Sequence, residues 1–342
     1  MARHIPGSYA RRKRKSLRWI YIVLALVIIA VLGFVYNPFG KDEGEISETL
    51  AETDIKEKAV SPVVMEPKPV PEPEPNFPQI KYDLPSEPNS RVAELIVEAM
   101  ACINEKPSRV IEARDRLNDL LVMSMGADQL VFIKDQLSEL SEQWLFSRTI
   151  FPQDNLCGSY EVKPGDLLST IGRRYMVPYE ILMDINRIAR PEALKHGEII
   201  KVINGPFHAR VYRSIFAMDL YLQDTFVRSF AVGLGKPGTE TPTGLLIVEP
   251  GGKLIKPTWT DPDTGKTYEA QDPDYPLGSR WIGLQGLKGE ATDRTGIAFH
   301  GTKDKETIGT ASSRGCIRLY NGQVILLYKL LAEGYSQVEI VE

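Results

Sequence analysis

One histidine and one cysteine near the end of this 342-residue chain have the types and spacing of a nucleophilic catalytic pair. His300 lies sixteen residues before Cys316, and the cysteine stands in the segment Ser-Arg-Gly-Cys-Ile-Arg, which places Arg318 two residues after it. A thiol with a partner imidazole and a fixed positive charge has the parts of an activated acyl-transfer nucleophile, because such neighbours can lower the thiol pKa. The segment therefore predicts a cysteine nucleophile with His300 as its base.

The other histidines and cysteines are weaker candidates. His4 lies in a basic N-terminal segment, His196 in a small module and His208 at the start of the last domain. The chain has three cysteines, and an odd number leaves at least one thiol free or joined to another chain. Cys102 and Cys157 could pair with each other in an exported protein, or each could be a small buried apolar residue.

Residues 207–342 have the pattern of a β-rich domain. Short runs that alternate apolar and polar residues, such as HARVYRSIF and FVRSFAVGL, are separated by glycine, proline and aspartate. One helix is expected at about 321–332 and a last strand at 337–341. His300 is expected at the end of a strand, so strand pairing must bring it to the cysteine.

Two other patterns in this domain lack the context that their chemistry needs. Residues 233–238 match G-x-G-x-x-G, but a dinucleotide site needs that loop to open a helix, and the following TETPTG cannot propagate one. Asp261, Asp263 and Glu269 do not have the spacing of an EF-hand loop, and no cluster of Cys, His and carboxylate has zinc spacing. We expect residues 261–275 to form a hairpin or lid over a cleft, with no metal and no cofactor.

Four motifs of this domain occur in a characteristic order. They are GKPGTETPTG at 235–244, YPLGSRWIGL at 275–284, FHGT at 299–302 and SRGCIRL at 313–319. Together they resemble the catalytic domain of the L,D-transpeptidases, the YkuD-type fold. The resemblance implies a mainly β domain, a β-sandwich-like barrel with the cysteine at the end of a cleft. It also implies attack on the stem tetrapeptide of peptidoglycan, release of D-alanine through a thioester, and acyl transfer to an amine to form a 3→3 cross-link.

The same resemblance assigns roles to the cysteine motif. Cys316 would be the nucleophile and His300 the general base, and the amides around Gly315 and Cys316 would form the oxyanion hole. Each donor of such a hole is worth about 2.7–4 kcal/mol in other enzymes. Ser313 would support the cysteine loop, and Arg318 would hold a carboxylate of the stem peptide or orient that loop.

Three further positions are expected in the substrate cleft. Gly301 follows the catalytic histidine, and Trp281 could help to exclude water from the thioester. Arg314 stands where many relatives have a second histidine, so only one imidazole is expected near the thiol.

Residues 159–203 resemble a LysM domain, the small glycan-binding β-α-α-β module. The matching positions are Tyr160, Val162, Gly165, Asp166, Leu168, Ile171, Tyr175, Val177, Leu182, Asn186, Ile188, Leu194 and Gly197. The resemblance implies that the loops at 165–168 and 186–190 hold N-acetylglucosamine-containing chains, with Gly165, Asp166, Leu168, Asn186 and Ile188 as contacts. Leu167 stands where the family commonly has threonine. A first helix is expected to start near Asp166 and a second at Pro178.

Residues 91–150 are predicted to form three helices, and they contain no recognisable catalytic or ligand-binding motif. Apolar residues recur at helical spacing on three successive faces, and Pro107-Ser108 indicates a break followed by an N-cap. We expect a spacer or a protein-docking unit.

The N-terminal part predicts a membrane anchor and a tether. Residues 1–18 carry seven Lys and Arg and no acid, and the uncharged apolar run at 19–36 has the length of a membrane-spanning helix. This pattern places the N-terminus in the cytoplasm and the rest outside it, in the periplasm or cell wall. A cleaved signal peptide and a nucleic-acid-binding arm fit less well, and no nucleic-acid partner is expected. Residues 37–90 are acidic and then proline-rich, typical of an extended linker.

Other classes of protein remain as alternatives. Sortases also combine His, Cys and Arg, but their histidine lies farther upstream and their threonine-rich cysteine motif is absent here. Papain-like amidases have the cysteine before the histidine. An L,D-carboxypeptidase would use the same acyl-enzyme with water as acceptor, and a non-catalytic wall-binding anchor would use only the glycan module. The expected partners are peptidoglycan stem peptides, glycan strands and, through the anchor, a membrane.

Overall fold

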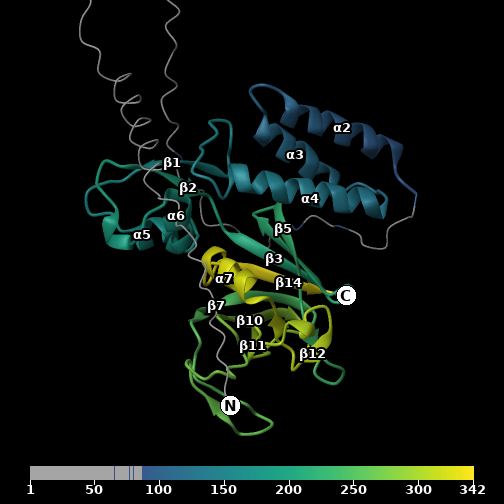
Figure 1. Cartoon of the computed structure of the whole chain (residues 1–342), viewed down its shortest axis with the longest axis vertical. Helices are drawn as coiled ribbons and strands as arrows, with labels where there is room; N and C mark the ends of the chain where they lie inside the picture. The colour runs from purple at the N-terminus through teal and green to yellow at the C-terminus, as the bar shows by residue number, and fades with distance from the viewer. Residues whose placement is uncertain (1–64, 66–76, 78–79, 81–86) are drawn as a thin grey trace, which may run out of the picture. The chain divides into compact units, whose positions relative to one another are not determined.

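The computed structural model describes residues 65, 77, 80 and 87–342, which include three helical or β-rich regions in chain order (Figure 1). The basic segment at 1–18 and the apolar run at 19–36 lie outside the described residues. Within the described ranges, no helix combines the length and the apolar character that a membrane crossing requires. The anchor therefore stays a prediction from the sequence.

Three helices form the first region: α2 (Ser90–Asn104), α3 (Val110–Leu120) and α4 (Ala127–Trp144). The side chain of Asn89 caps α2 by accepting hydrogen bonds from the first amides of the helix. The break after α2 lies where Pro107 predicted it, but the expected cap at Ser108 is wrong, because α3 begins at Val110 with Arg109 as its N-cap. The Arg109 guanidinium bonds the carboxylates of Glu105 and Glu112, one on each side of the break.

Buried ion pairs fix α4 to its neighbours. Lys134 Nζ donates to Asp219 Oδ2 of strand β4 (Ala217–Leu222) at 2.6 Å, and both side chains are almost completely buried. Arg114 pairs with Asp154 at 2.8 Å and lies over the ring of Trp144 at 4.5 Å. A buried charge is stable only when it is paired in this way. The helical unit is therefore packed against the β-rich domain, which a freely hinged spacer would not be.

The second region has the predicted β-α-α-β order. Strands β1 (Cys157–Glu161) and β2 (Ile199–Ile203) pair antiparallel, with α5 (Leu168–Arg174), α6 (Tyr179–Asn186) and the short η1 (Pro191–Ala193) between them. The first helix starts at Leu168, two residues later than predicted. The Asp166 carboxylate accepts hydrogen bonds from the Tyr160 hydroxyl at 2.7 Å and the Lys163 amide at 2.8 Å, which holds the preceding turn outside the helix.

The third region is a mainly β domain built on one mixed sheet of eight strands in the order β13-β11-β10-β7-β14-β3-β4-β5. Neighbouring strands are antiparallel except for the pairs β11–β13 and β14–β3. Beside it, β6 pairs with β12 and β8 pairs with β9. The bounds are β3 (Phe207–Tyr212), β5 (Thr225–Ala231), β6 (Leu234–Gly235), β7 (Gly244–Leu254), β8 (Trp259–Thr260), β9 (Thr267–Tyr268), β10 (Trp281–Gly289), β11 (Ile297–His300), η2 (Lys305–Thr307), β12 (Ala311–Ser313), β13 (Ile317–Arg318), α7 (Asn321–Leu330) and β14 (Gln337–Val341).

Three described residues of the proline-rich segment are not part of a free tether. The Met65 amide donates to Ser159 O at 3.0 Å, and Met65 O accepts from the Tyr175 hydroxyl. Phe77 is buried edge-on against the rings of His208 and Tyr221, and Ile80 is also buried. The composition of this segment predicted an extended linker, but these three described residues contact the folded domains or are buried.

The cysteines do not form a disulfide. Cys102, Cys157 and Cys316 are all free thiols, and the first two are buried. Burial raises the pKa of the Cys157 thiol, which keeps it protonated and unreactive. Of the two alternatives for Cys102 and Cys157, the buried apolar residue is therefore the correct one.

Candidate active site

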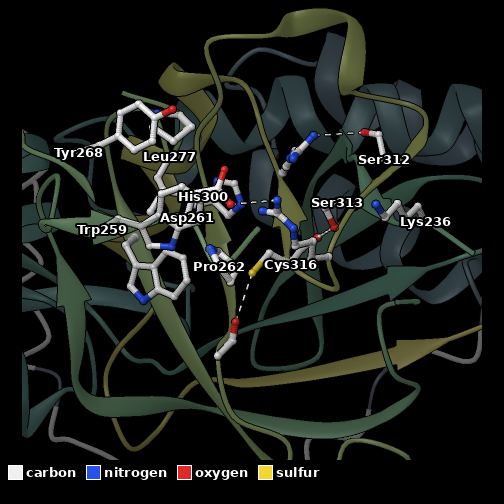
Figure 2. Close-up of a pocket in the computed structure, with 15 residues that line it drawn as sticks. Lys236, Trp259, Asp261, Pro262, Tyr268, Leu277, His300, Ser312, Ser313 and Cys316 are labelled. Carbon is white, nitrogen blue, oxygen red and sulfur yellow. Dashed lines mark hydrogen bonds and ion pairs between the residues drawn. The ribbon is translucent and has the colours of Figure 1, made fainter. Parts of the chain in front are cut away.

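Parallel pairing of two short strands brings the histidine to the cysteine. Strand β11 ends at His300, and β13 begins directly after Cys316. In the register of this pair, Phe299 lies opposite Ile317 and His300 opposite Arg318. The chain between them forms η2 and β12 before it returns, which accounts for the sixteen-residue spacing. Both side chains line one cavity of about 460 Å³ (Figure 2).

The cysteine loop is held by a serine inside it. The Ser313 hydroxyl donates to Cys316 O at 2.6 Å and accepts from the Gly315 amide at 3.1 Å. Gly315 has φ +111°, a conformation that residues with a side chain rarely adopt. The predicted support role of Ser313 therefore has a direct geometric basis.

The same hydrogen bond bears on the predicted oxyanion hole. The Gly315 amide already donates to Ser313, so it does not point at a substrate oxygen in this structure. The Cys316 amide donates to no group in the described part of the chain. Of the two amides predicted for the oxyanion hole, that of Gly315 is therefore engaged within the loop, and that of Cys316 remains available to a ligand.

The Cys316 thiol is protonated at rest. It is half-buried, and Sγ donates to Gly296 O at 3.3 Å rather than to the His300 ring. Burial raises its pKa, and the Ala298 amide and the Arg318 guanidinium oppose that rise only in part. The depressed thiol pKa that the neighbouring residues predicted is therefore wrong for the resting state, because burial outweighs the nearby charge.

The His300 imidazole is neutral, and its tautomer leaves one ring nitrogen free to accept a proton. Its Nδ1 lies 2.6 Å from Gly301 O, and because a carbonyl only accepts hydrogen bonds, Nδ1 must carry the proton. The lone pair is then on Nε2. Burial lowers the pKa of His300 to about 4. The ring also stacks on Trp281, with centroids 5.8 Å apart and an interplanar angle of 15°.

Gly301 and one unpredicted residue position this histidine. A Cβ at Gly301 would lie 2.2 Å from Asn321 Oδ1, so only glycine fits here. Asn321 Nδ2 donates to Thr302 O at 3.0 Å, and its Oδ1 accepts from the Ser279 amide at 2.9 Å. Asn321 thereby links the segment after His300 to that before β10. Its place at the start of α7 gave no signal of this role in the sequence.

A hairpin lies over the cavity. The predicted lid is present but begins earlier, since Trp259 of β8 stacks on Tyr268 of β9 with centroids 6.0 Å apart. Both aromatic residues line the cavity and were missed from the sequence. Arg314 joins the hairpin to the cysteine loop through ion pairs with Asp261 at 3.0 Å and with Asp263. The two carboxylates therefore bind a guanidinium, and the described residues hold no group suited to a metal ion.

The glycine motif at 233–238 serves backbone packing. Strand β6 pairs in parallel with β12, and no helix follows it. A Cβ at Gly233 would lie 2.3 Å from Thr307 O, and one at Gly235 would lie 2.2 Å from Thr239 O. Gly233 thus allows a close approach to η2, and Gly235 allows the tight turn that follows it.

Several predicted glycan contacts are internal to their domain. Leu168 is fully buried. Asn186 donates through Nδ2 to Leu182 O and Lys201 O and accepts from the Lys201 amide at 2.7 Å, so its side chain is satisfied inside the fold. Neither side chain is available to a ligand in this structure, because Leu168 is packed in the core and Asn186 holds α6 to β2.

The remaining predicted positions lie nearer the surface. Gly165 has φ +85° in an exposed turn, and Asp166 is held by that turn. Ile188 is half-buried against the core. Leu167, in the same loop as Gly165, is 63% exposed. Leu167 is therefore the side chain of this loop that is available to a ligand.

Two segments of the chain match models of known families. Residues 209–340 match the L,D-transpeptidase catalytic domain, YkuD, and residues 160–202 match the LysM domain. The chain therefore carries an L,D-transpeptidase catalytic domain preceded by a LysM domain, as the motifs predicted.

Similar proteins include bacterial relatives of the same type. A candidate L,D-transpeptidase of Bacillus licheniformis, YkuD, is 25% identical over 182 residues, which are 51% of this chain and 94% of that protein. YkuD of Bacillus subtilis is 26% identical over 183 residues, with 52% and 94% covered. Among solved structures, the L,D-transpeptidase from Mycobacterium smegmatis has a TM-score of 0.30 and 12% identity, and the match covers 43% of this chain and 64% of that one.

Proposed function

We propose that this protein is a peptidoglycan L,D-transpeptidase in which Cys316 carries the acyl group. The observation that supports this most is the cavity that holds the Cys316 thiol together with a neutral His300 ring whose Nδ1 proton is fixed by Gly301 O. The match of residues 209–340 to the transpeptidase catalytic domain supports the same reaction class. The donor would be a stem tetrapeptide and the leaving group its terminal D-alanine.

Acylation begins with transfer of the Cys316 proton to His300 Nε2. The thiolate then attacks the carbonyl carbon after the third residue of the stem, and the carbonyl oxygen becomes an oxyanion that the Cys316 amide can bind. The protonated imidazole next gives its proton to the nitrogen of D-alanine as the peptide bond breaks. The products are free D-alanine and a thioester on Cys316. Because both groups are neutral at rest, the proton moves only when a substrate is present.

Transfer repeats these steps with a new nucleophile. An amine of a second stem attacks the thioester carbon, His300 accepts the proton that the amine loses, and the departing sulfur takes that proton back. The result is a 3→3 cross-link and a regenerated thiol. Trp281 and the β8–β9 hairpin would limit the access of water to the thioester.

The remaining predicted residues have supporting roles in this proposal. Ser313 holds the loop that carries Cys316, and Gly315 permits its backbone conformation. Arg318 lines the cavity with its guanidinium bonded to Ser312 Oγ at 3.2 Å, where it can bind a carboxylate of the donor. Arg314 lines the cavity, and its main role in this proposal is to hold the β8–β9 hairpin through its ion pairs with Asp261 and Asp263.

The other domains would place the enzyme on the cell wall. The LysM domain is proposed to bind glycan strands, with the loop of Gly165 and Leu167 as its contact surface. The apolar run at 19–36 is proposed as a single membrane anchor with the catalytic domain outside the cytoplasm, facing the periplasm or cell wall.

Two alternatives predict different products. An L,D-carboxypeptidase forms the same thioester but resolves it with water, and a non-catalytic wall-binding anchor forms none. The aromatic lid favours the transpeptidase, because exclusion of water protects a thioester that waits for an amine.

The test uses the full chain, since Met65 and Phe77 of the proline-rich segment pack on the domains. Wild-type protein and the Cys316→Ala variant are incubated with a disaccharide-tetrapeptide, and the products are weighed by mass spectrometry. We expect a dimer that has lost one D-alanine, formed by the wild type alone. Shortened monomer without dimer supports the carboxypeptidase, and unchanged substrate with both proteins supports the anchor.

A further inference from the structure

The cavity around Cys316 has two chemically different sides. Trp259, Tyr268 and Leu277 form an apolar side at the hairpin, and Lys236 and Ser312 lie on the other side (Figure 2). The thiol lies between them. A ligand that fills this cavity must therefore be apolar or planar on one side and polar on the other.

The polar side carries more positive charge than the cavity neutralises. Three cations line it: Lys236, Arg314 and Arg318. The Arg314 guanidinium is paired with Asp261 and Asp263, so its charge is compensated by the lid. In the described part of the chain, neither of the other two has a carboxylate within ion-pair distance.

The surroundings of Lys236 do not supply that missing anion. The nearest acid along its loop is Glu240, whose carboxylate accepts from the Gly238 amide at 2.9 Å instead. Arg318 bonds the neutral hydroxyl of Ser312. A negatively charged group of a ligand is thus the natural partner of this side of the cavity.

Backbone hydrogen bonds fix the position of Lys236 relative to the thiol. The Lys236 amide donates to Ser313 O at 2.9 Å, next to the end of the β6–β12 pair. Ser313 in turn donates to Cys316 O. Only two hydrogen bonds therefore separate the backbone of Lys236 from that of the nucleophile. Because these are backbone bonds, substitution of Lys236 by Met or Arg keeps their donors and acceptors.

We propose that Lys236 is a specificity-determining residue, whose ammonium group binds a carboxylate of the acyl donor and selects a free acid over the corresponding amide. This assignment rests on the proposed function for the identity of the donor. The positive charge beside Cys316 is a property of the cavity itself, and it can be tested without a peptide.

The first experiment compares two small thiol reagents on the full chain. Iodoacetate is an anion and iodoacetamide is its neutral counterpart, and peptide mapping gives the rate of modification at Cys316 alone. We expect Lys236→Met to lower the ratio of the iodoacetate rate to the iodoacetamide rate by about three- to tenfold at low ionic strength, and salt to reduce the difference. Lys236→Arg should restore the ratio.

A matched control separates local from general charge effects. Lys305 is an exposed lysine of η2 that does not line the cavity. Lys305→Met removes the same charge and should leave the ratio within about twofold of the wild type, because solvent screens exposed charges at this range. A ratio that Lys236→Met does not change, or that both variants change equally, overturns the proposal.

The second experiment measures peptide binding in the Cys316→Ala protein by calorimetry. The probes are the stem tetrapeptide as the free acid, the same peptide with its C-terminal carboxyl as an amide, and one with the third-residue side-chain carboxyl as an amide. We expect one of the amides to bind about tenfold more weakly, and the difference to vanish in the Cys316→Ala, Lys236→Met double variant.

The outcomes distinguish the two claims. Equal binding of all three peptides overturns the role of Lys236 but leaves the proposed function standing. Binding of none of them contradicts the proposed donor, and the ratio of alkylation rates then still decides whether Lys236 supplies the positive charge beside the thiol.

Discussion

The His300 imidazole lies face to face with the indole of Trp281, with ring centroids 5.8 Å apart and planes 15° from parallel. The two residues are also direct partners across the β10–β11 pair. The stacking fixes the plane of the imidazole, and the bond from Nδ1 to Gly301 O fixes its rotation within that plane. The histidine is thus oriented by an aromatic ring and a backbone carbonyl, and no carboxylate among the described residues bonds its ring.

Substitution of Trp281 should therefore reduce catalysis through the histidine. We expect Trp281→Ala to lower kcat/KM by about 10- to 100-fold, because the imidazole loses its orientation and gains water. Trp281→Phe keeps a stacking ring and should stay within about threefold of the wild type. The test is steady-state release of D-alanine. Equal losses in both variants would indicate that the indole contacts the substrate instead of orienting His300.

The pKa of His300 sets the acid limit of activity. A base must be unprotonated to accept the thiol proton, and the pKa of His300 is lowered to about 4 by burial. The value of kcat/KM should therefore stay constant as the pH is lowered from 7, and it should fall only as the pH approaches 4. The check is kcat/KM for D-alanine release across the pH range. A fall centred near pH 6.5, the ordinary value for histidine, would contradict this assignment.

The same shift makes stability depend on pH. The unfolded chain holds histidines with pKa near 6.5, whereas His300 and His208 have folded values of about 4. Between these values the unfolded state binds more protons, so stability is complete above pH 6.5 and is lost as the pH falls toward 4, by about 3 kcal/mol at most for each histidine. Urea unfolding at pH 7 and pH 5 measures this loss. In His208→Gln, the remaining loss should be about half that of the wild type.

Ser313 should matter for both stability and turnover. Its hydroxyl is buried and bonds Cys316 O and the Gly315 amide. Ser313→Ala leaves these two groups unpaired and should lower the free energy of unfolding by about 1–3 kcal/mol. Ser312→Ala, one residue earlier and half-exposed, should cost much less. Chemical denaturation measures both, and a stable but inactive Ser313→Ala would place the serine in the chemistry itself.

Lys201 should hold the LysM domain to the helical unit. Its buried Nζ donates to the carbonyls of Trp144, Ser147 and Thr149 at 2.5, 2.9 and 2.8 Å, at the C-terminal end of α4. Lys201→Met leaves these carbonyls without a donor and should destabilise the protein by about 2–3 kcal/mol.

The control for this prediction is the exposed Lys195 of the same domain. Lys195→Met removes an equal charge without a buried partner, so its unfolding transition should match that of the wild type. If Lys201→Met also unfolds like the wild type, the three carbonyls are satisfied in some other way.

Local sequence patterns predicted the helices and strands. They did not predict which strands and side chains pair over long distances in the chain. Apolar spacing located the helices, and the motifs around His300 and Cys316 located two residues that line one cavity. The strand register that sets His300 opposite Arg318 could not be read from the sequence, since it depends on partners eighteen residues apart. The ion pair of Arg314 with Asp263 spans fifty-one residues, so the sequence predicted the hairpin or lid but not its link to the cysteine loop.

The predicted site was wrong where a residue type could serve either the fold or a ligand, because the sequence alone does not distinguish these two roles. Asn186 was expected in a ligand-binding loop, but it is the last residue of α6, and its side-chain amide bonds the backbone of β2. The thiol pKa was expected to fall because charged neighbours were visible in the sequence. The burial that raises it depends on the fold alone.

The most direct test of the central claim is the intact mass of the full chain after brief mixing with stem tetrapeptide in the absence of an acceptor amine. We predict a species heavier by the tripeptide acyl group, that is, the donor without its D-alanine. This species should be missing in Cys316→Ala and should be released by hydroxylamine, as a thioester is. An adduct that persists in Cys316→Ala, or one that still contains D-alanine, would contradict acyl transfer through Cys316.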